Sequence, residues 1–145
     1  MSFRIHFSKK DCVACNACYE ACIDQNDINI KAGEEPFRNG LEYEPRSMVK
    51  ANIATCIHCT DAACIKVCQH GAIHRDMETG FVVYDRDLCQ RCGRCKASCP
   101  IDAIHFRVDG SIGKCDGCYE RVKRGLLPPC VKCCPTECLR LERVF

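Results

Sequence analysis

The stretch at residues 89–100, CQRCGRCKASCP, constrains this chain more than any other. Its cysteines follow the spacing C-x2-C-x2-C-x3-C-P, in which three thiolates wrap a cubane iron–sulfur cluster and the fourth serves a neighbouring cluster. Two intervening residues allow a tight loop to turn successive sulfurs towards one centre, whereas three residues carry the last sulfur away from it. The proline fits the first turn of a helix because it has no amide hydrogen to lose there.

Three further copies or near-copies of this motif occur in the chain. Motif one repeats the spacing, motif two has four residues in its middle gap, and motif four has an eleven-residue insert, YERVKRGLLPP. A proline follows the last cysteine in motifs three and four, whereas Ile23 and Gln69 stand there in motifs one and two. The motif cysteines are Cys12, Cys15, Cys18 and Cys22 in motif one, Cys56, Cys59, Cys64 and Cys68 in motif two, Cys89, Cys92, Cys95 and Cys99 in motif three, and Cys115, Cys118, Cys130 and Cys134 in motif four.

The composition supports a metal-held fold. Cysteine accounts for 18 of the 145 residues and tryptophan is absent, so an ordinary apolar core must be thin. Small domains of this kind usually depend on metals or disulfides.

The formal net charge is +2 with neutral cysteines. Because a cubane with its four thiolates carries about −2, four of them bring the net charge to about −6. Basic residues near the cysteines then compensate charge, and no nucleic-acid surface is expected.

The sequence shows no targeting or membrane-spanning segment. Its N-terminal stretch, MSFRIHFSKKDC, lacks an apolar signal region and a twin-arginine pair, and no apolar run approaches spanning length. A cytoplasmic location and no direct membrane insertion are therefore expected. Thiols stay reduced in the cytoplasm, which argues against a disulfide scaffold and for metal.

Short antiparallel strands are expected between the motifs. Alternating apolar and polar residues predict a strand over residues 3–7, which could pair with the C-terminal residues 139–145. Two hairpins are predicted, one with strands 72–75 and 81–84 around the turn 77–80, and one with strands 103–108 and 111–112 around Asp109-Gly110. The segment KAGEEPFRNG, residues 31–40, reads as a surface loop, and residues 41–55 as extended chain.

The alternation of cysteine motif and hairpin indicates duplicated ferredoxin units, since its period is too irregular for a solenoid. The motifs resemble those of the four-cluster iron–sulfur electron-transfer subunits of the DMSO reductase type, found with molybdenum and tungsten enzymes, formate dehydrogenases and hydrogenase-linked complexes. The resemblance rests on CIHCTDAACIKVC, GFVVYDRDLCQRCGRCKASCP and KCDGCYERVKRGLLPPCVKCCP. It implies an α+β fold of two ferredoxin-like 2[4Fe-4S] units with short helices. Residues 51–104, with motifs two and three, would be inserted in an outer unit of residues 1–50 plus 105–145.

The same resemblance implies four crossed ligand sets, each with three cysteines from one motif and one from its partner motif. Cluster 1 would use Cys12, Cys15, Cys18 and Cys134; cluster 2 would use Cys22, Cys115, Cys118 and Cys130; cluster 3 would use Cys56, Cys59, Cys64 and Cys99; and cluster 4 would use Cys68, Cys89, Cys92 and Cys95. All sixteen motif thiolates are then ligands.

The roles of a few other residues are less clear from the sequence. The x3 spacing and Pro135 select Cys134 over Cys133 as the ligand. Cys133 and Cys138 are then left over, and we interpret both as small buried hydrophobic residues. His58 reads as a hydrogen-bond donor to a sulfide or as solvent-exposed, and a ligand role is disfavoured because the cysteine count is already complete. The basic residues Arg121, Lys123, Arg124, Arg91, Arg94 and Lys96 form a solvated face, or they shield the clusters or meet an acidic partner.

Cubane clusters shuttle single electrons, and nothing else in the sequence looks catalytic. We therefore expect a non-catalytic electron-transfer subunit in an oxidoreductase complex of anaerobic metabolism. Its catalytic partner would be a tungsten or molybdenum enzyme of aldehyde or formate type, by family analogy alone. A second redox partner, a flavoprotein, a ferredoxin or another copy of the chain, would meet the far end of a row of four clusters.

Three other interpretations compete with this one. A free-standing polyferredoxin would serve several partners. A zinc scaffold would use C-x2-C pairs, although the cysteine triplets suit separate tetrahedral sites poorly. A disulfide-rich secreted domain would need a signal peptide.

Overall fold

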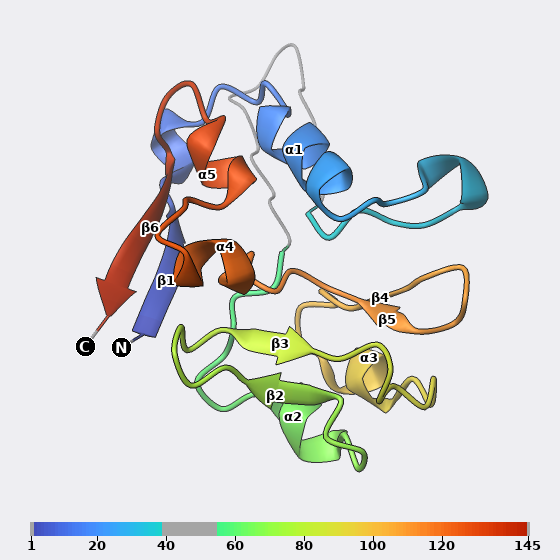
Figure 1. The fold of residues 1–145 in the computed structure, drawn as a ribbon. Coiled ribbons are helices and arrows are strands. Elements are labelled where there is room, and N and C mark those ends of the chain that lie inside the picture. The colour runs from blue at the N-terminus through green and yellow to red at the C-terminus, as the bar shows by residue number, and fades with distance from the viewer. Residues whose placement is uncertain (1, 39–54, 145) are drawn as a thin grey trace.

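The two ends of the chain pair with each other. The computed structural model describes residues 2–38 and 55–144; within it, strand β1 (Ser2–Phe7) runs antiparallel to strand β6 (Leu139–Val144) (Figure 1). Ser2 lies opposite Val144 and Phe7 opposite Leu139. Side chains of β1 alternate between exposed and half-buried positions, as expected for a strand with one face on the core. The predicted pairing of the two termini is confirmed.

Helices from the first and fourth motifs lie together beside this strand pair. Helix α1 (Ala17–Gln25) packs against α5 (Pro129–Lys132), and α5 contacts β6. Helix α4 (Tyr119–Lys123) lies between the second and third cysteines of motif four. Short 3-10 turns, η1 (Lys9–Asp11) and η2 (Ile30–Ala32), come before motif one and after α1. Segments more than 100 residues apart thus form one half of the molecule.

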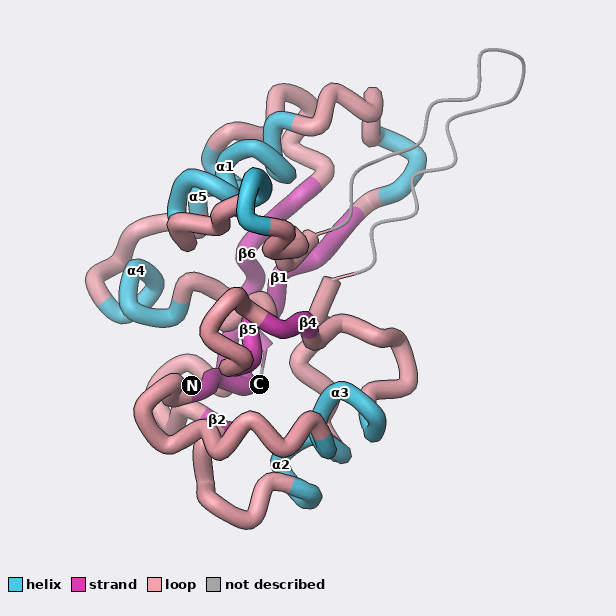
Figure 2. The backbone as a smooth tube through the Cα atoms, turned by 90° about the vertical axis from the view of Figure 1, so that its right-hand side faces the viewer, coloured by secondary structure: helices cyan, strands magenta, loops and turns pink. Residues whose placement is uncertain are grey.

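The second and third motifs make up the other half. Helix α2 (Ala63–Val67) packs against α3 (Arg94–Ser98), and both lie at the end of the molecule away from α1 and α5 (Figure 2). Strand β2 (Ile73–Arg75) pairs with β3 (Val82–Tyr84), and β4 (His105–Phe106) pairs with β5 (Ile112–Gly113). Both predicted hairpins are confirmed; β2, β3 and β4 are shorter than the sequence suggested, and β5 begins one residue later than predicted.

Two small apolar clusters form the core. The larger one lies under α2, α3 and the two hairpins, where half-buried cysteines pack against buried residues. Its buried members are Ala62, Ile73, Val82, Cys95, Ile104 and Ile112. The smaller one joins the halves, because Phe81 and Val83 of the β2–β3 hairpin pack with Val122, Phe3 and Ile5. A core this small agrees with the thin apolar core expected from the composition.

Polar contacts reinforce the junction between the halves. The amide of Phe3 donates to the carbonyl of Thr79 at 2.7 Å, and Lys123 Nζ lies 2.8 Å from Asp76 Oδ1. Lys123 therefore holds the two halves together, a structural role that the sequence did not distinguish from a solvated face.

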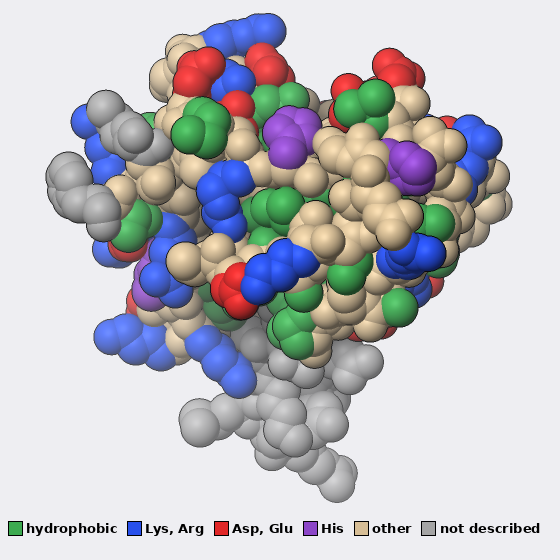
Figure 3. Space-filling view, turned by 90° about the horizontal axis from the view of Figure 1, so that it is seen from below, with side chains coloured by type: hydrophobic (Ala, Val, Ile, Leu, Met, Phe, Trp, Pro, Cys, Tyr) green, Lys and Arg blue, Asp and Glu red, His purple; other side chains and the backbone are tan. Residues whose placement is uncertain are grey.

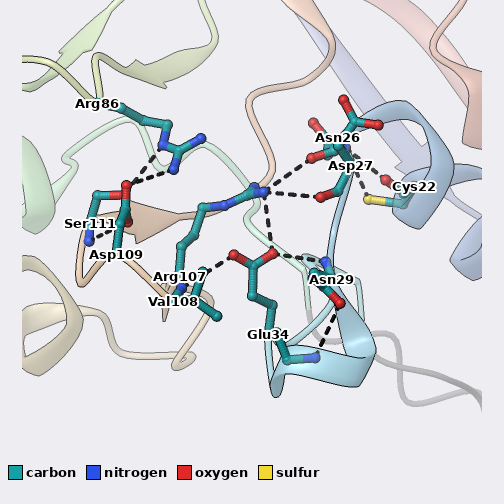
Figure 4. A network of polar contacts seen from close by, with 11 residues as sticks. Cys22, Asn26, Asp27, Asn29, Glu34, Arg86, Arg107, Val108, Asp109 and Ser111 are labelled. Atoms are coloured by element: carbon teal, nitrogen blue, oxygen red, sulfur yellow. Dashed lines mark hydrogen bonds and ion pairs between the residues drawn. The ribbon is translucent and has the colours of Figure 1, made fainter.

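The interpretation of residues 31–40 as a surface loop is wrong for three of its members. Glu34, Phe37 and Arg38 are buried. Glu34 accepts hydrogen bonds from the amides of Asn29 and Val108, and Arg107 pairs with it, which ties this segment to the β4–β5 turn (Figure 4). These partners lie up to 74 residues away, so local composition could not indicate them. The extended chain expected over residues 41–55 lies outside the described residues except for Thr55.

The structure confirms short antiparallel strand pairs combined with short helices. The nesting of one ferredoxin-like unit in the other stays a prediction. Ile112 lies in the apolar cluster of the second and third motifs, although the predicted boundary gives residues 105–145 to the outer unit. None of the helices in the described ranges is both long and apolar enough to span a membrane.

Candidate iron–sulfur cluster sites

All four cysteine motifs turn at the same position. The residue two after the first cysteine has a left-handed backbone in each motif, at Ala14 (φ 56°), His58 (φ 52°), Arg91 (φ 59°) and Gly117 (φ 71°). A left-handed residue reverses the chain sharply, and its amide then points to the concave side of the loop. The amides of His58 and Gly117 each lie 3.4 Å from the Sγ of the preceding motif cysteine. The shared turn, which lies between the first two cysteines of each motif, thus directs their sulfurs to the same side of the loop.

One set of four cysteines lines a cavity beside the terminal strands. It combines Cys12, Cys15 and Cys18 of motif one with Cys134, and it encloses about 310 Å³ of space that is partly open to solvent. Cys18 lies in the first turn of α1, and Cys134 follows α5, so the packing of these helices brings the sulfurs together. These are the four residues expected for cluster 1.

A second cavity is lined by residues of both α1 and α5. Its wall includes Cys22 near the end of α1, Cys115 and Cys118 around Gly117, and Cys130 in α5. The space measures about 360 Å³. Asn26 Nδ2 donates to the Cys22 carbonyl at 2.9 Å and lies 3.5 Å from its Sγ (Figure 4). The four cysteines are those expected for cluster 2.

The third cavity belongs to the other half of the molecule. Cys56, Cys59 and Cys64 of motif two line it together with Cys99, which follows α3. Its volume is about 390 Å³, and its wall also contains Lys114. The cysteines are those expected for cluster 3.

The cysteines expected for cluster 4 lie beside the larger apolar cluster. Cys95 is one of its buried members, and Cys68 and Cys89 pack against it, whereas Cys92 is exposed. Burial raises the pKa of Cys68, but hydrogen bonds from the amides of residues 70–73 outweigh it, so the net shift is downward. Burial raises the pKa of Cys95 to about 11, with the nearby thiols of Cys89 and Cys92 adding to the effect.

The two additional cysteines differ in their surroundings. Cys133 is exposed and its Sγ lies 3.6 Å from the Cys130 carbonyl, so it is not the buried hydrophobe that the sequence suggested. Cys138 is buried, as expected, and its Sγ lies 3.3 Å from that of Cys134 in the wall of the first cavity. The first cavity is therefore lined by five thiols.

The electrostatics of these thiols fit a positively charged metal core. Burial, helped by the charges of Cys115 and Cys130, raises the pKa of Cys22 to about 12, and burial raises the pKa of Cys130 to about 11. Crowded buried thiols of this kind keep their protons unless a cation binds them as thiolates, which couples metal binding to deprotonation. Among residues 2–38 and 55–144, no three His, Cys, Asp or Glu side chains gather as closely as a single metal ion requires.

Sequence reasoning missed two buried cations and the surroundings of one histidine. Arg38 lines the second cavity and Lys114 lines the third. Lys114 is fully buried, and its Nζ donates to the carbonyls of Val82 and Cys115. His58 Nδ1 accepts from the Val82 amide at 2.9 Å, which leaves the hydrogen on its buried, unpartnered Nε2. His58 is thus a donor placed inside the protein, and solvent exposure of its Nε2 was the wrong alternative.

Comparison with known proteins gives the class of the chain. A family model described as a 4Fe-4S dicluster domain matches residues 49–144. The chain belongs to this family, and it is an iron–sulfur protein of electron transport. This favours iron–sulfur clusters over the zinc-binding and disulfide-rich alternatives.

The individual relatives carry the names of redox enzymes. The B subunit of the anaerobic dimethyl sulfoxide reductase of Escherichia coli (strain K12) is 39% identical over 141 residues, covering 88% of this chain and 67% of the relative. The B subunit of the same enzyme in Haemophilus influenzae is 35% identical over 151 residues, covering 94% and 72%. The hydrogenase-2 operon protein HybA of Escherichia coli O157:H7 is 30% identical over 155 residues, covering 86% and 46%. The resemblance to subunits of the DMSO reductase type is confirmed.

Proposed function

We propose that the chain holds four [4Fe-4S] clusters with the sixteen motif cysteines and conducts single electrons between two redox partners. The observation that carries this proposal is the composition of three cavities, each lined by three cysteines of one motif and one cysteine of a distant motif. When bound, the clusters supply the one-electron chemistry. The protein supplies thiolates, amide donors and buried cations around them.

Neighbouring ligand sets share helices, which supports a continuous row. Cys18 and Cys22 lie four residues apart on α1, so these ligands of the first and second sites are about 6 Å apart along the helix axis. Cys64 and Cys68, and likewise Cys95 and Cys99, relate the third and fourth sites in the same way through α2 and α3. Lys114 lines the third cavity, and its Nζ donates to the carbonyl of Cys115, which lines the second cavity, so the second and third sites are also close.

The exposure of the cysteines supports a conductor with two accessible ends. All eighteen cysteines are described. Apart from the additional Cys133, the exposed ones are Cys15, in the set for cluster 1, and Cys92, in the set for cluster 4. The sets for clusters 2 and 3 contain no exposed cysteine. Clusters 1 and 4 are therefore the proposed ends of the row, in line with nested units in which clusters 2 and 3 meet in the middle.

The proposed partners follow from the relatives. One end would meet a catalytic subunit, as the names of the dimethyl sulfoxide reductase relatives suggest; a tungsten or molybdenum enzyme of aldehyde or formate type remains our specific proposal. The other end would meet a flavoprotein, a ferredoxin or another copy of the chain. The face shown in Figure 3 carries scattered apolar, basic and acidic side chains, a mixed surface suited to protein contacts. A free-standing polyferredoxin is the alternative, and the proteins that co-purify from the native source distinguish the two.

A reducing compartment such as the cytoplasm is the proposed location. None of the eighteen cysteines is in a disulfide, which suits a compartment that keeps thiols reduced.

The crossed ligand sets are tested by Cys22→Ala. We expect it to remove or convert the cluster held by Cys115, Cys118 and Cys130, although these residues lie more than 90 positions away in sequence. Electron paramagnetic resonance spectra of the reduced holoprotein should lose one signal, and the iron content should fall by at most about four per chain.

Cys133→Ala is the matched control for Cys22→Ala and should leave all four clusters intact. Loss of a cluster in Cys133→Ala, or a Cys22→Ala protein with every cluster intact, would contradict the proposed sets.

A further inference from the structure

The second cavity contains a buried arginine that binds no carboxylate in the part of the chain described. Arg38 is only 3% exposed, and it lines the cavity together with Cys22, Cys115 and Cys130. It lies at the end of a segment that folds inward through Glu34 and Phe37, so the backbone before it is fixed by the contacts described above. A buried guanidinium costs considerable free energy unless charged or polar groups satisfy it.

The donors of Arg38 point to a partner in this cavity. Its Nη2 lies 4.0 Å from Cys130 Sγ, at the long end of the range for a hydrogen bond to sulfur. Its Nη1 is buried and has no hydrogen-bond partner in the structure. Because leaving a charged buried donor unsatisfied is costly, a group that occupies the cavity and accepts from Nη1 is expected.

Arg38 places its positive charge in the second cavity, among the four cysteines that line it. One group opposes it in the second cavity. The carboxyl of Asp116 lines the same cavity and accepts from the Cys118 amide at 2.7 Å. Among the described residues, Arg38 is the cation in the wall of this cavity.

We propose that Arg38 donates a hydrogen bond from Nη1 to a sulfur of the cluster in the second cavity and raises the reduction potential of that cluster. Hydrogen bonds to sulfur and nearby positive charge both favour the reduced, more negative form. Reduction adds one electron, received from a neighbouring cluster, and requires no proton because the guanidinium stays protonated. Arg38 is neither a ligand nor a catalytic residue; it stabilises the reduced state of cluster 2.

This inference rests on the proposed function, because it requires a cluster bound by Cys22, Cys115, Cys118 and Cys130. The two can fail separately. The iron content and spectrum of the unmodified chain test whether the cluster is present. The potentials of Arg38 variants test what the arginine does to it.

The experiment compares three variants of the anaerobic holoprotein by redox titration followed with electron paramagnetic resonance. Arg38→Gln removes the charge, Arg38→Lys keeps the charge but removes the forked donor, and Arg4→Gln removes an exposed arginine on β1 as a control for net charge. The signal lost in Cys118→Ser identifies the cluster in question. Iron is counted in every variant.

We expect Arg38→Gln to lower the midpoint potential of that one cluster, with at least a tenfold change in its reduction equilibrium, about 59 mV for a one-electron couple. Arg38→Lys should give a smaller fall, and Arg4→Gln should leave all four potentials in place. Selective loss of this cluster in Arg38→Gln, with the other three retained, would also support the proposal. Unchanged potentials in Arg38→Gln, equal shifts of all clusters, or loss of all four clusters in both Arg38 variants would overturn it.

Discussion

At the scale of single residues, the geometry of each site depends on the residue two positions after the first cysteine of its motif, which has a left-handed backbone conformation. Three motifs place a residue with a side chain there, and the fourth places Gly117. The reason for glycine is a close approach: a Cβ at Gly117 would lie 2.6 Å from the ring of Phe81, at the junction between the halves. A second glycine, Gly125, has a similar φ of 75° but open space around it. A comparison of alanine variants at Gly117 and Gly125 therefore distinguishes the cost of backbone strain, which both share, from the cost of steric overlap, which only Gly117 has.

Gly117→Ala should therefore destabilise the protein more than Gly125→Ala. Backbone strain alone costs about 1–2 kcal/mol in either variant. At Gly117, overlap with a packed ring adds about 1–3 kcal/mol. Thermal denaturation of the two holoproteins, compared with the unmodified chain, checks this order. Equal losses in the two variants would show that Phe81 yields easily and that the junction is loosely packed.

At the scale of elements, a polar network fastens the loop after α1 to the β4–β5 turn. Glu34 accepts from the Asn29 amide at 2.9 Å and from the Val108 amide at 3.2 Å, and Arg107 Nη2 lies 3.3 Å from its carboxylate. The Asn29 amide, followed by Val108 and Arg107, holds the pKa of Glu34 below its usual value despite burial. The same loop continues into Arg38, so the network also positions the arginine at the second cavity.

Glu34→Gln should cost about 1.5–3 kcal/mol of stability at pH 7, the usual range for hydrogen bonds to a charged group. The lowered pKa in the folded state gives a stabilisation that is fully present above the unfolded value of about 4.3 and is lost as the pH falls through the lower folded value. Thermal denaturation at pH 7 measures the loss. Glu20→Gln, an exposed position on α1, is the control and should melt with the unmodified protein. A Glu34→Gln protein that melts with the control would contradict the network.

At the scale of the whole molecule, the sequence predicted what depends on spacing and local pattern. The motifs, both hairpins and the pairing of the chain ends are readable because each rests on a short run of residues. The buried positions of Arg38 and Lys114 cannot be predicted in this way. A cation in a short segment with glycines reads as solvated until partners from distant segments surround it. The sequence also could not decide whether His58 is a buried hydrogen-bond donor or exposed to solvent. The tautomer of its imidazole is fixed by the amide of Val82, which lies 24 residues away in the sequence.

The same reasoning explains why the charged residues gather around the sites. The apolar core is small, and the thiol sites occupy much of the interior. Buried cations compensate negative charge there and contribute hydrogen bonds that an aliphatic core could not. The fold and the proposed electron path are thus built from the same residues, and a change at one site is expected to reach its neighbour through α1, α2 or α3.

The most direct test of the four-cluster conductor is the iron and acid-labile sulfide content of the protein, isolated without oxygen. Four cubanes predict about sixteen irons and sixteen sulfides per chain, by four of each in every cluster. A well-folded protein with about eight irons per chain would contradict the account, because two clusters could not connect the exposed ends at Cys15 and Cys92 through both inner sites.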